Sequence, residues 1–133
     1  MKPQPQSIPG PPGIVLLVDD ANDCLEMLNM ALQSLPGVVI RCAHTAEDAL
    51  KLLAVSRISA LVTDIHLPLM TGLELISHVR KQPALETLPI VVVSAATDPA
   101  APGAAFASGA NAFFPKPFSP AAVRRKLEEL MYA

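Results

Sequence analysis

Short runs of consecutive apolar residues alternate along this chain with longer segments in which apolar residues recur every three or four positions. The runs are rich in β-branched side chains and end at polar residues, so they predict strands. The first run, residues 14–18, contains no polar residue, so its strand is expected to be buried on both faces, as in parallel sheets. The predicted strands cover residues 14–18, 38–43, 58–63, 90–93 and 110–114.

The segments between the strands predict helices with one apolar face. Leucines recur at helical spacing from Leu25 to Leu35, and Pro36-Gly37 then stops the helix. Further helix starts are predicted at Thr45 with Asp48 as an imperfect capping box, at Thr71, at Asp98-Pro99 and at Ser119-Pro120. Strand and helix therefore alternate five times, which predicts an α/β fold: a parallel sheet with helices on both faces, joined by right-handed crossovers.

Polar side chains follow four of the five predicted strands. Asp19 and Asp20 come after the first strand, Asp64 after the third, Ser94 after the fourth and Lys116 after the fifth. Because the strands of a parallel sheet all end at the same edge, these groups are expected to lie close together. Open α/β folds bind their ligands at this edge.

Three carboxylates held a few ångströms apart repel one another by roughly 1–4 kcal/mol per pair. Either such crowding raises the pKa values of the carboxylates, or a cation sits among them. Carboxylate oxygens with room for water suit Mg²⁺ or Mn²⁺. The alternative is that Asp19, Asp20 and Asp64 separately cap the helices that follow them. A lysine at the same edge favours a shared site.

Asp64 is fixed by a strand before it and by Leu67-Pro68 after it. A carboxylate with a metal ion beside it and an ammonium group opposite can accept a phosphoryl group as an aspartyl phosphate. The metal ion and Lys116 would offset the charge on the oxygens of the transferred group. A cis bond between Lys116 and Pro117 would aim the ammonium group back into the site. The alternative for Lys116 is a solvated surface lysine.

The composition narrows the possible functions. A length of 133 residues with 51% apolar residues suits one domain with a real core. The net charge of −2 does not indicate a nucleic-acid surface. No apolar run is long enough to span a bilayer, and the amino terminus has no apolar signal core. The two cysteines, Cys24 and Cys42, lack metal-ligand spacing and are expected to be reduced thiols in a cytoplasmic protein.

Residues 1–13 contain five prolines and predict a flexible tail ahead of a domain that covers residues 14–133. Pro9 and Pro12 form a minimal PxxP pattern, for which a plain leader is the simpler interpretation. The histidines His44 and His78 lie on separate predicted elements and are not expected to bind metal.

The polar motifs, taken together, resemble those of the receiver domain of two-component response regulators. They are Val18-Asp19-Asp20, Asp64 through Pro68 to Gly72, Val93-Ser94-Ala95 and Lys116-Pro117-Phe118. Each motif alone is weak, but the spacings of 44 residues from Asp20 to Asp64, 30 to Ser94 and 22 to Lys116 match this family closely. The resemblance covers residues 14 to about 131. It implies a doubly wound, flavodoxin-like (CheY-like) sheet with strand order 2-1-3-4-5.

The resemblance also implies roles at the phosphoryl group. Asp64 would take this group from a histidine kinase or a histidine phosphotransfer protein. Ser94 would hydrogen-bond the bound phosphoryl group, and Lys116 would pair with it. Phe113 falls at the family's switch-aromatic position and would turn inward when Ser94 moves. Because Phe113 has no hydroxyl group, only burial of its ring is available as a switch.

Metal binding and phosphoryl lifetime follow from the same resemblance. Asp20 would bind Mg²⁺ directly, Asp19 largely through water, and Asp64 and the backbone carbonyl of His66 would be further ligands. His66 and Ala96 occupy the two positions that tune hydrolysis of the phosphoryl group. Ala96 cannot position a water molecule, which predicts a fairly long-lived phosphorylated state. His66 could act in either direction, or be a partly exposed loop histidine with no such role.

The segment 98–112 departs from the family. Receiver domains usually present a charged helix here, but this segment has no charge after its first residue, and Pro102 and Gly103 stand where the first helical turns should be. We expect a short, irregular or mobile helix and a partner surface that is unusual for the family. Plain tolerance of a poor helix is the alternative.

The leading hypothesis is a single-domain response regulator that signals by altered contacts with a downstream protein, without nucleic-acid or membrane binding, as a monomer or a phosphorylation-dependent homodimer. The chain could instead be a receiver fragment of a larger regulator or hybrid kinase. An aspartate-nucleophile, Mg²⁺-dependent phosphohydrolase is a further alternative. Such enzymes carry a second acid two residues after the nucleophile, where His66 stands here. A scaffold that has lost phosphorylation fits less well with the intact polar set.

Overall fold

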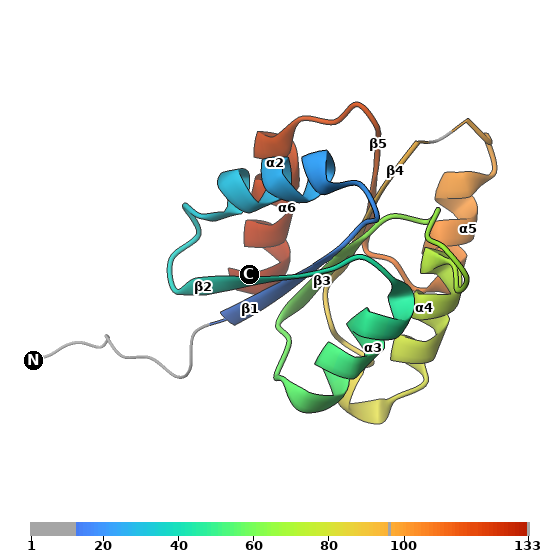
Figure 1. Ribbon diagram of the computed structural model, residues 1–133, viewed down its shortest axis with the longest axis horizontal. Helices are drawn as coiled ribbons and strands as arrows, with labels where there is room; N and C mark the ends of the chain where they lie inside the picture. Colours follow the sequence, from blue (N-terminus) through green and yellow to red (C-terminus); the bar gives the residue numbers. More distant parts are fainter. Residues whose placement is uncertain (1–12, 96, 133) are drawn as a thin grey trace, which may run out of the picture.

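A five-stranded parallel sheet forms the centre of the computed structural model, which describes residues 13–95 and 97–132 (Figure 1). The strand order is β2-β1-β3-β4-β5, with every neighbouring pair parallel. The strands are β1 (Gly13–Val18), β2 (Val38–Ala43), β3 (Ala60–Thr63), β4 (Ile90–Ser94) and β5 (Ala112–Pro115). The predicted α/β class and the 2-1-3-4-5 order are both confirmed.

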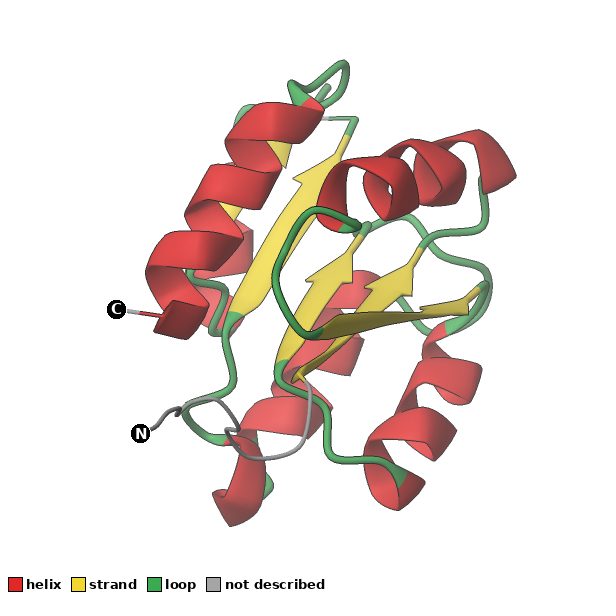
Figure 2. Cartoon of the chain, turned by 90° about the vertical axis from the view of Figure 1, so that its left-hand side faces the viewer, coloured by secondary structure: helices red, strands yellow, loops and turns green. Residues whose placement is uncertain are grey.

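Helices lie on both faces of the sheet, as Figures 1 and 2 show. They are α2 (Asn22–Leu32), α3 (Ala46–Val55), α4 (Gly72–Arg80), α5 (Ala101–Ser108) and α6 (Pro120–Tyr132), with a short 3₁₀ helix η1 (Pro83–Leu85) before β4. Two apolar cores result: α2 and α6 pack on one face of the sheet, and α3, α4 and α5 pack on the other.

The central strand β1 shows why its apolar run is unbroken. Leu16 and Val18 point into the core of α3, α4 and α5, whereas Val15 and Leu17 point into the core of α2 and α6. All four side chains are almost completely buried. A strand that is buried on both faces needs an apolar residue at every position.

Two strands begin two residues later than predicted, and the other strand boundaries agree with the prediction to within one residue. β3 begins at Ala60 rather than at residue 58, although Ile58 is buried in the core ahead of the strand. β5 begins at Ala112 rather than at residue 110, because the N–H of Ala110 donates to the carbonyl of Ala105 (3.0 Å) and closes helix α5. Gly109 makes this closure possible with a φ of 122°, which favours glycine.

Three predicted helix starts are confirmed. The hydroxyl groups of Thr45, Thr71 and Ser119 each accept the backbone N–H three residues on, at 3.1, 3.1 and 3.2 Å. Glu74 completes a full capping box at Thr71, which the sequence analysis did not predict. α2 ends at Leu32, earlier than the leucine spacing suggested, and begins after Ala21 with no side-chain cap.

Two predictions for the segment around α5 are wrong. α5 is short, with eight residues, but it is a regular α-helix and not an irregular one. Pro102 lies in its first turn, where a backbone N–H needs no helical partner. Asp98 does not cap this helix: its carboxylate accepts the N–H of Ala100 (2.9 Å), and Ala100 itself is the N-cap residue.

The predicted tail is largely outside the described residues, which begin at Gly13 in β1. Cys24 is buried and Cys42 is exposed, and both are free thiols, as expected. None of the helices in residues 13–95 and 97–132 combines the length and the apolar character that crossing a bilayer requires.

Gly72 and Gly103 provide a matched test of the packing at the start of α4. A Cβ at Gly72 would overlap the backbone carbonyl of Asp64, whereas a Cβ at Gly103 would have open space around it. We expect Gly72→Ala to lower the free energy of unfolding by about 1–3 kcal/mol. Gly103→Ala is expected to leave it unchanged or raise it by about 0.5–1 kcal/mol. Urea denaturation measures both changes, and equal effects of the two substitutions would contradict the packing.

Candidate functional site

The carboxyl ends of the central strands bring the predicted polar groups together. Asp64 follows β3 and donates its backbone N–H to the carbonyl of Val18 (3.0 Å), so it lies beside the end of β1, where Asp19 follows. Lys116 follows β5, and its backbone N–H donates to the carbonyl of Ser94 (2.9 Å) at the end of β4. Residues that are far apart in the chain therefore share one edge of the sheet.

Lys116 bridges two buried carboxylates. Its Nζ lies 2.8 Å from Asp19 Oδ2 and 2.9 Å from Asp64 Oδ2. The Asp19 and Asp64 side chains are 3% and 8% exposed, and the Lys116 side chain is 25% exposed. The Lys116–Pro117 bond is cis, as the sequence suggested. The alternative of a solvated surface lysine is therefore wrong.

Both carboxylate oxygens of Asp64 have hydrogen-bond donors. Oδ1 accepts the hydroxyl group of Ser94 (2.6 Å) and the backbone N–H of His66 (3.0 Å), while Oδ2 accepts the ammonium group of Lys116. These donors hold the carboxylate in one orientation and balance its charge in a place from which water is largely excluded.

Neither buried aspartate caps a helix. Asp19 Oδ1 accepts the N–H of Ala21 (2.9 Å), which is the N-cap residue of α2 and lies before the first helical turn. Asp64 is separated from α4 by a loop, and Thr71 caps that helix. The alternative that these residues are separate helix caps is thus wrong for α2 and α4.

Asp20 completes an acidic cluster with the two buried aspartates. One carboxylate oxygen from each of Asp19, Asp20 and Asp64 lies within 4.8 Å of the others. Asp20 is exposed, so the cluster is open to solvent on one side. Three carboxylates and one ammonium group leave excess negative charge. Hard oxygen donors with solvent access fit a small divalent cation that keeps part of its water shell.

The cluster also shifts the pKa values of its neighbours. Burial alone lowers the pKa of the Lys116 ammonium group, but hydrogen bonds and charge from Asp19 and Asp64 outweigh burial and raise this pKa above its usual value. Lys116 therefore stays charged. Burial, together with a hydrogen bond to Asp19, raises the pKa of the Cys24 thiol from 9.0 to about 12.

Cys24 was not among the predicted site residues. It lies in the first turn of α2. The one signal in the sequence that could have placed it here is its position in the helix that is predicted to begin just after Asp20. Its raised pKa keeps it a neutral thiol near neutral pH, so it adds no further negative charge to the cluster.

The remaining predicted residues lie around this cluster or outside the described residues. Phe113, on β5 beside Val92 of β4, is partly buried against the core of α3, α4 and α5. The His66 side chain is exposed, and its backbone N–H holds Asp64. Ala96 lies outside the described residues. His44 forms a hydrogen bond with Asn22 and is not part of the acidic cluster.

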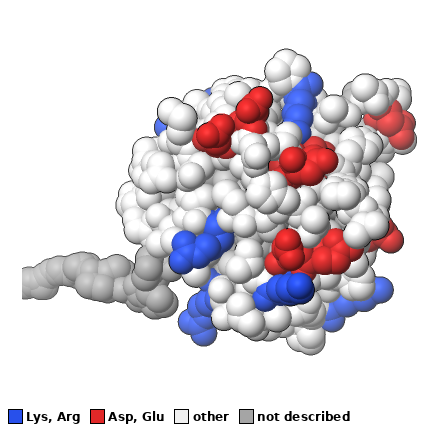
Figure 3. All heavy atoms as spheres, viewed as in Figure 1, with Lys and Arg blue, Asp and Glu red and all other residues white. Residues whose placement is uncertain are grey.

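Charge on the surface follows no single pattern. On the face shown in Figure 3, acidic and basic side chains are interspersed in small groups, and the described lysines and arginines form no continuous basic surface there. This agrees with the net charge of −2 for the whole chain.

Comparison with known proteins identifies the family. The family model "Response regulator receiver domain" matches residues 15–128. A chemotaxis protein CheY homolog of Campylobacter jejuni is 30% identical over 118 residues, which cover 88% of this chain and 91% of that protein. Response regulator MprA of Mycobacterium ulcerans is 34% identical over 117 residues, which cover 88% of this chain but 46% of that longer protein.

Solved structures agree with the sequence comparison. The chemotaxis response regulator CheY4 of Vibrio cholerae superposes with a TM-score of 0.80 and 28% identity, over 90% of this chain and 98% of that chain. The strand order and the polar groups at the carboxyl edge fit the same assignment. The chain therefore belongs to the family of response regulator receiver domains.

Proposed function

We propose that Asp64 accepts a phosphoryl group from a phosphohistidine of a histidine kinase or histidine phosphotransfer protein, and that this changes the contacts of the chain with a downstream protein. The contact set of Asp64 supports the proposal. Its carboxylate is 8% exposed, fixed by Ser94 and the His66 N–H, and paired with Lys116 beside the acidic cluster.

In the proposed reaction, a carboxylate oxygen of Asp64 attacks the phosphorus atom of the phosphohistidine. A P–O bond forms and the P–N bond breaks, and the imidazole leaves with the electron pair and takes up a proton from solvent. Ser94 and Lys116, which now donate to the carboxylate, would then donate to oxygens of the phosphoryl group. Asp19 holds Lys116 in place for this exchange (2.8 Å).

Asp19, Asp20, Asp64 and the backbone carbonyl of His66 are the groups that we propose to hold Mg²⁺ or Mn²⁺. When bound, this ion would supply positive charge to the oxygens of the transferring phosphoryl group. The three carboxylates already converge within 4.8 Å, which supports this donor set.

Ser94 connects the phosphoryl group to the rest of the fold. Its Oγ now bonds Asp64 (2.6 Å), so a shift toward a phosphoryl oxygen would move the end of β4 and the start of the loop to α5. Phe113 lies on the adjacent strand and would bury its ring in the space that such a shift opens. This switch does not need a hydroxyl group on the ring.

Two alternatives lead to different expectations. A phosphohydrolase would release phosphate repeatedly, but His66 stands where such enzymes carry their second acid. The chain could also be a receiver unit within a larger regulator, since MprA is about twice the matched length. From the proposed role we also expect a downstream protein target and a cytoplasmic location. We expect the chain to be a monomer or a phosphorylation-dependent homodimer.

Phosphorylation of Asp64 can be tested by intact-mass measurement. After incubation with Mg²⁺ and acetyl phosphate, the parent chain is expected to gain one phosphoryl group. Asp64→Asn is expected to gain none, because an amide cannot act as the acceptor. Steady release of phosphate without accumulation of the modified chain would instead favour a hydrolase.

Asp20→Asn tests the divalent-ion site. Without Mg²⁺, removal of this charge relieves repulsion, so we expect the free energy of unfolding to rise by about 0.5–1 kcal/mol, a small effect because Asp20 is exposed. The increase in Tm that millimolar MgCl₂ gives the parent should be largely lost. Glu86→Gln removes an exposed acid ahead of β4 and serves as the control, with an unchanged Mg²⁺ response. Equal Mg²⁺ responses of the parent and Asp20→Asn would contradict the site.

Ala96→Glu tests the lifetime of the phosphorylated state. A carboxylate two residues after Ser94 can position a hydrolytic water molecule, which alanine cannot, so we expect the aspartyl phosphate to decay about tenfold faster or more. Ala107→Glu on the exposed side of α5 adds the same charge and should not change the decay. Equal lifetimes of Ala96→Glu and the parent would count against this role.

A further inference from the structure

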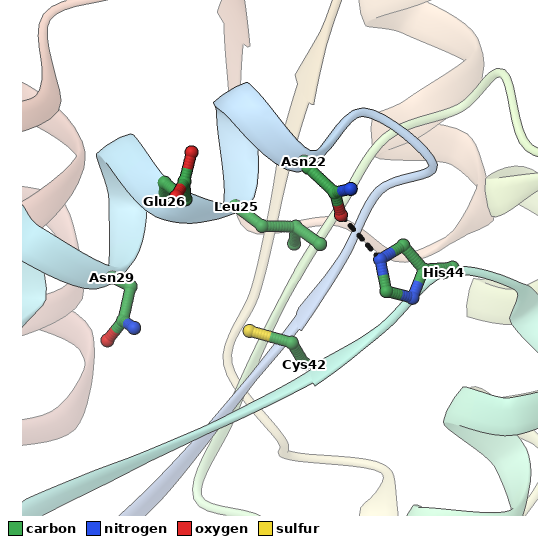
Figure 4. A pocket seen from close by; sticks show the side chains of 6 residues that line it. All are labelled: Asn22, Leu25, Glu26, Asn29, Cys42 and His44. Atoms are coloured by element: carbon green, nitrogen blue, oxygen red, sulfur yellow. Dashed lines mark hydrogen bonds between the residues drawn. The ribbon is translucent and has the colours of Figure 1, made fainter.

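A hydrogen bond outside the acidic cluster links the start of α2 to the loop after β2. His44 Nε2 lies 2.7 Å from Asn22 Oδ1, and Figure 4 shows the imidazole ring and the amide group directed toward each other. Because an amide oxygen only accepts hydrogen bonds, His44 donates from Nε2. This bond joins residues from two elements that flank the acidic cluster.

The start of α2 lacks a side-chain cap, although Asp19 accepts the N–H of Ala21 and Cys24 is buried in the first turn. Ala21 is the N-cap residue and has no side chain that can accept a bond from the first helical turn. Uncapped helix ends fray, and capping typically stabilises them. The Asn22–His44 bond accepts none of the free N–H groups, but it ties the first residue of α2 to the loop after β2.

Asp20 lies in the chain between Asp19, which is held in place, and Asn22, which bonds His44. Asp19 is held by Lys116 (2.8 Å) and by the N–H of Ala21 (2.9 Å). Asp20 is exposed, and among the residues that the structure describes no hydrogen bond or ion pair holds its carboxylate. The direction of this carboxylate therefore depends on how well the backbone on either side of it is fixed.

We propose that His44 is a positioning residue for the divalent-ion site: by holding Asn22, it fixes the start of α2 and keeps the Asp20 carboxylate directed at Asp19 and Asp64. This inference rests on the proposed function, since it assigns Asp20 to ion binding. His44 touches neither the ion nor the phosphoryl group and acts through Asn22.

The surroundings of the bond set the size of the expected effect. Asn22 and His44 form one end of an open groove of about 420 Å³ between α2 and β2, which Leu25, Glu26, Asn29 and Cys42 also line (Figure 4). Both partners are exposed, so water can replace the lost bond in part. A single hydrogen bond of this kind corresponds to a two- to tenfold change in an equilibrium constant.

Calorimetric titration of the full, unphosphorylated chain with MgCl₂ tests the proposal. We expect His44→Ala and Asn22→Ala each to weaken Mg²⁺ binding by about two- to tenfold. The double variant should bind about as tightly as either single variant, because both changes remove the same bond. His44→Gln keeps a side-chain N–H donor and should restore most of the affinity. His78→Ala, an exposed histidine on α4, is the matched control and should bind as the parent does.

Two results would overturn the proposal. One is Mg²⁺ binding by His44→Ala that equals that of the parent. The other is a double variant whose loss is the product of the two single losses, since that would show independent effects. A purely structural role would lower Tm without Mg²⁺ and leave the Mg²⁺ dissociation constant unchanged, which also counts against positioning.

The acetyl phosphate reaction separates this proposal from the proposed function. If the parent is phosphorylated, His44→Ala should need a higher Mg²⁺ concentration for half-maximal rate and reach the same maximal rate at saturating Mg²⁺. An unchanged Mg²⁺ requirement would refute the positioning role and leave phosphorylation intact. If the parent binds Mg²⁺ with the expected dependence on His44 but is never phosphorylated, the proposed function fails and the positioning role remains.

Discussion

The contact of one ammonium group with two buried carboxylates is the interaction on which the functional edge of this protein depends. Lys116 Nζ lies within 3 Å of both Asp19 and Asp64, which come from the ends of two adjacent central strands. Two carboxylates at this depth would strongly destabilise the fold without a cation, since a buried charge that loses its partner typically costs 3–5 kcal/mol. Lys116 therefore stabilises the folded chain, and under the proposed function it would also pair with the transferred phosphoryl group.

The fold brings these groups together through its strand order. β1 and β3 are neighbours in the middle of the sheet, and β4 and β5 follow on one side, so the residues after all four strands lie along one edge. Cores on both faces fix the strands against movement. Close packing of Gly72 against the backbone of Asp64 then sets where α4 begins, and the Thr71 capping box holds that start. Rigid elements on both sides of the loop after β3 thus leave little freedom to the Asp64 carboxylate.

The parts of the site differ in how firmly they are held, and this difference suits a switch. Asp64 and Ser94 are buried and bonded to each other. Asp20, in contrast, is exposed and lies next to the start of α2, which His44 contacts through Asn22. Beyond Ser94, α5 contributes only Ala105 to the fully buried residues, although the loop after it is well tied to α4 through Arg80, which donates to the carbonyl of Gly109. Elements with few buried contacts open most readily. A movement of Ser94 would therefore be expected to shift α5, the next helix along the chain, more easily than the other helices.

Much of the architecture and the main site residues could be predicted from the sequence, because local patterns encode them. Unbroken apolar runs specify strands that are buried on both faces, threonine and serine caps specify helix starts, and the polar residues after the runs specify one edge of a parallel sheet. The sequence favoured a shared site over separate helix caps, but it could not show that Lys116 bonds both Asp19 and Asp64. Nor could it show that α5 is regular despite Pro102 and Gly103, or that Cys24 and the Asn22–His44 bond lie beside the acidic cluster. Only the tertiary structure decided these points, because a short motif determines the chemistry of a side chain, whereas its partner and its distance depend on which strands and helices pack side by side.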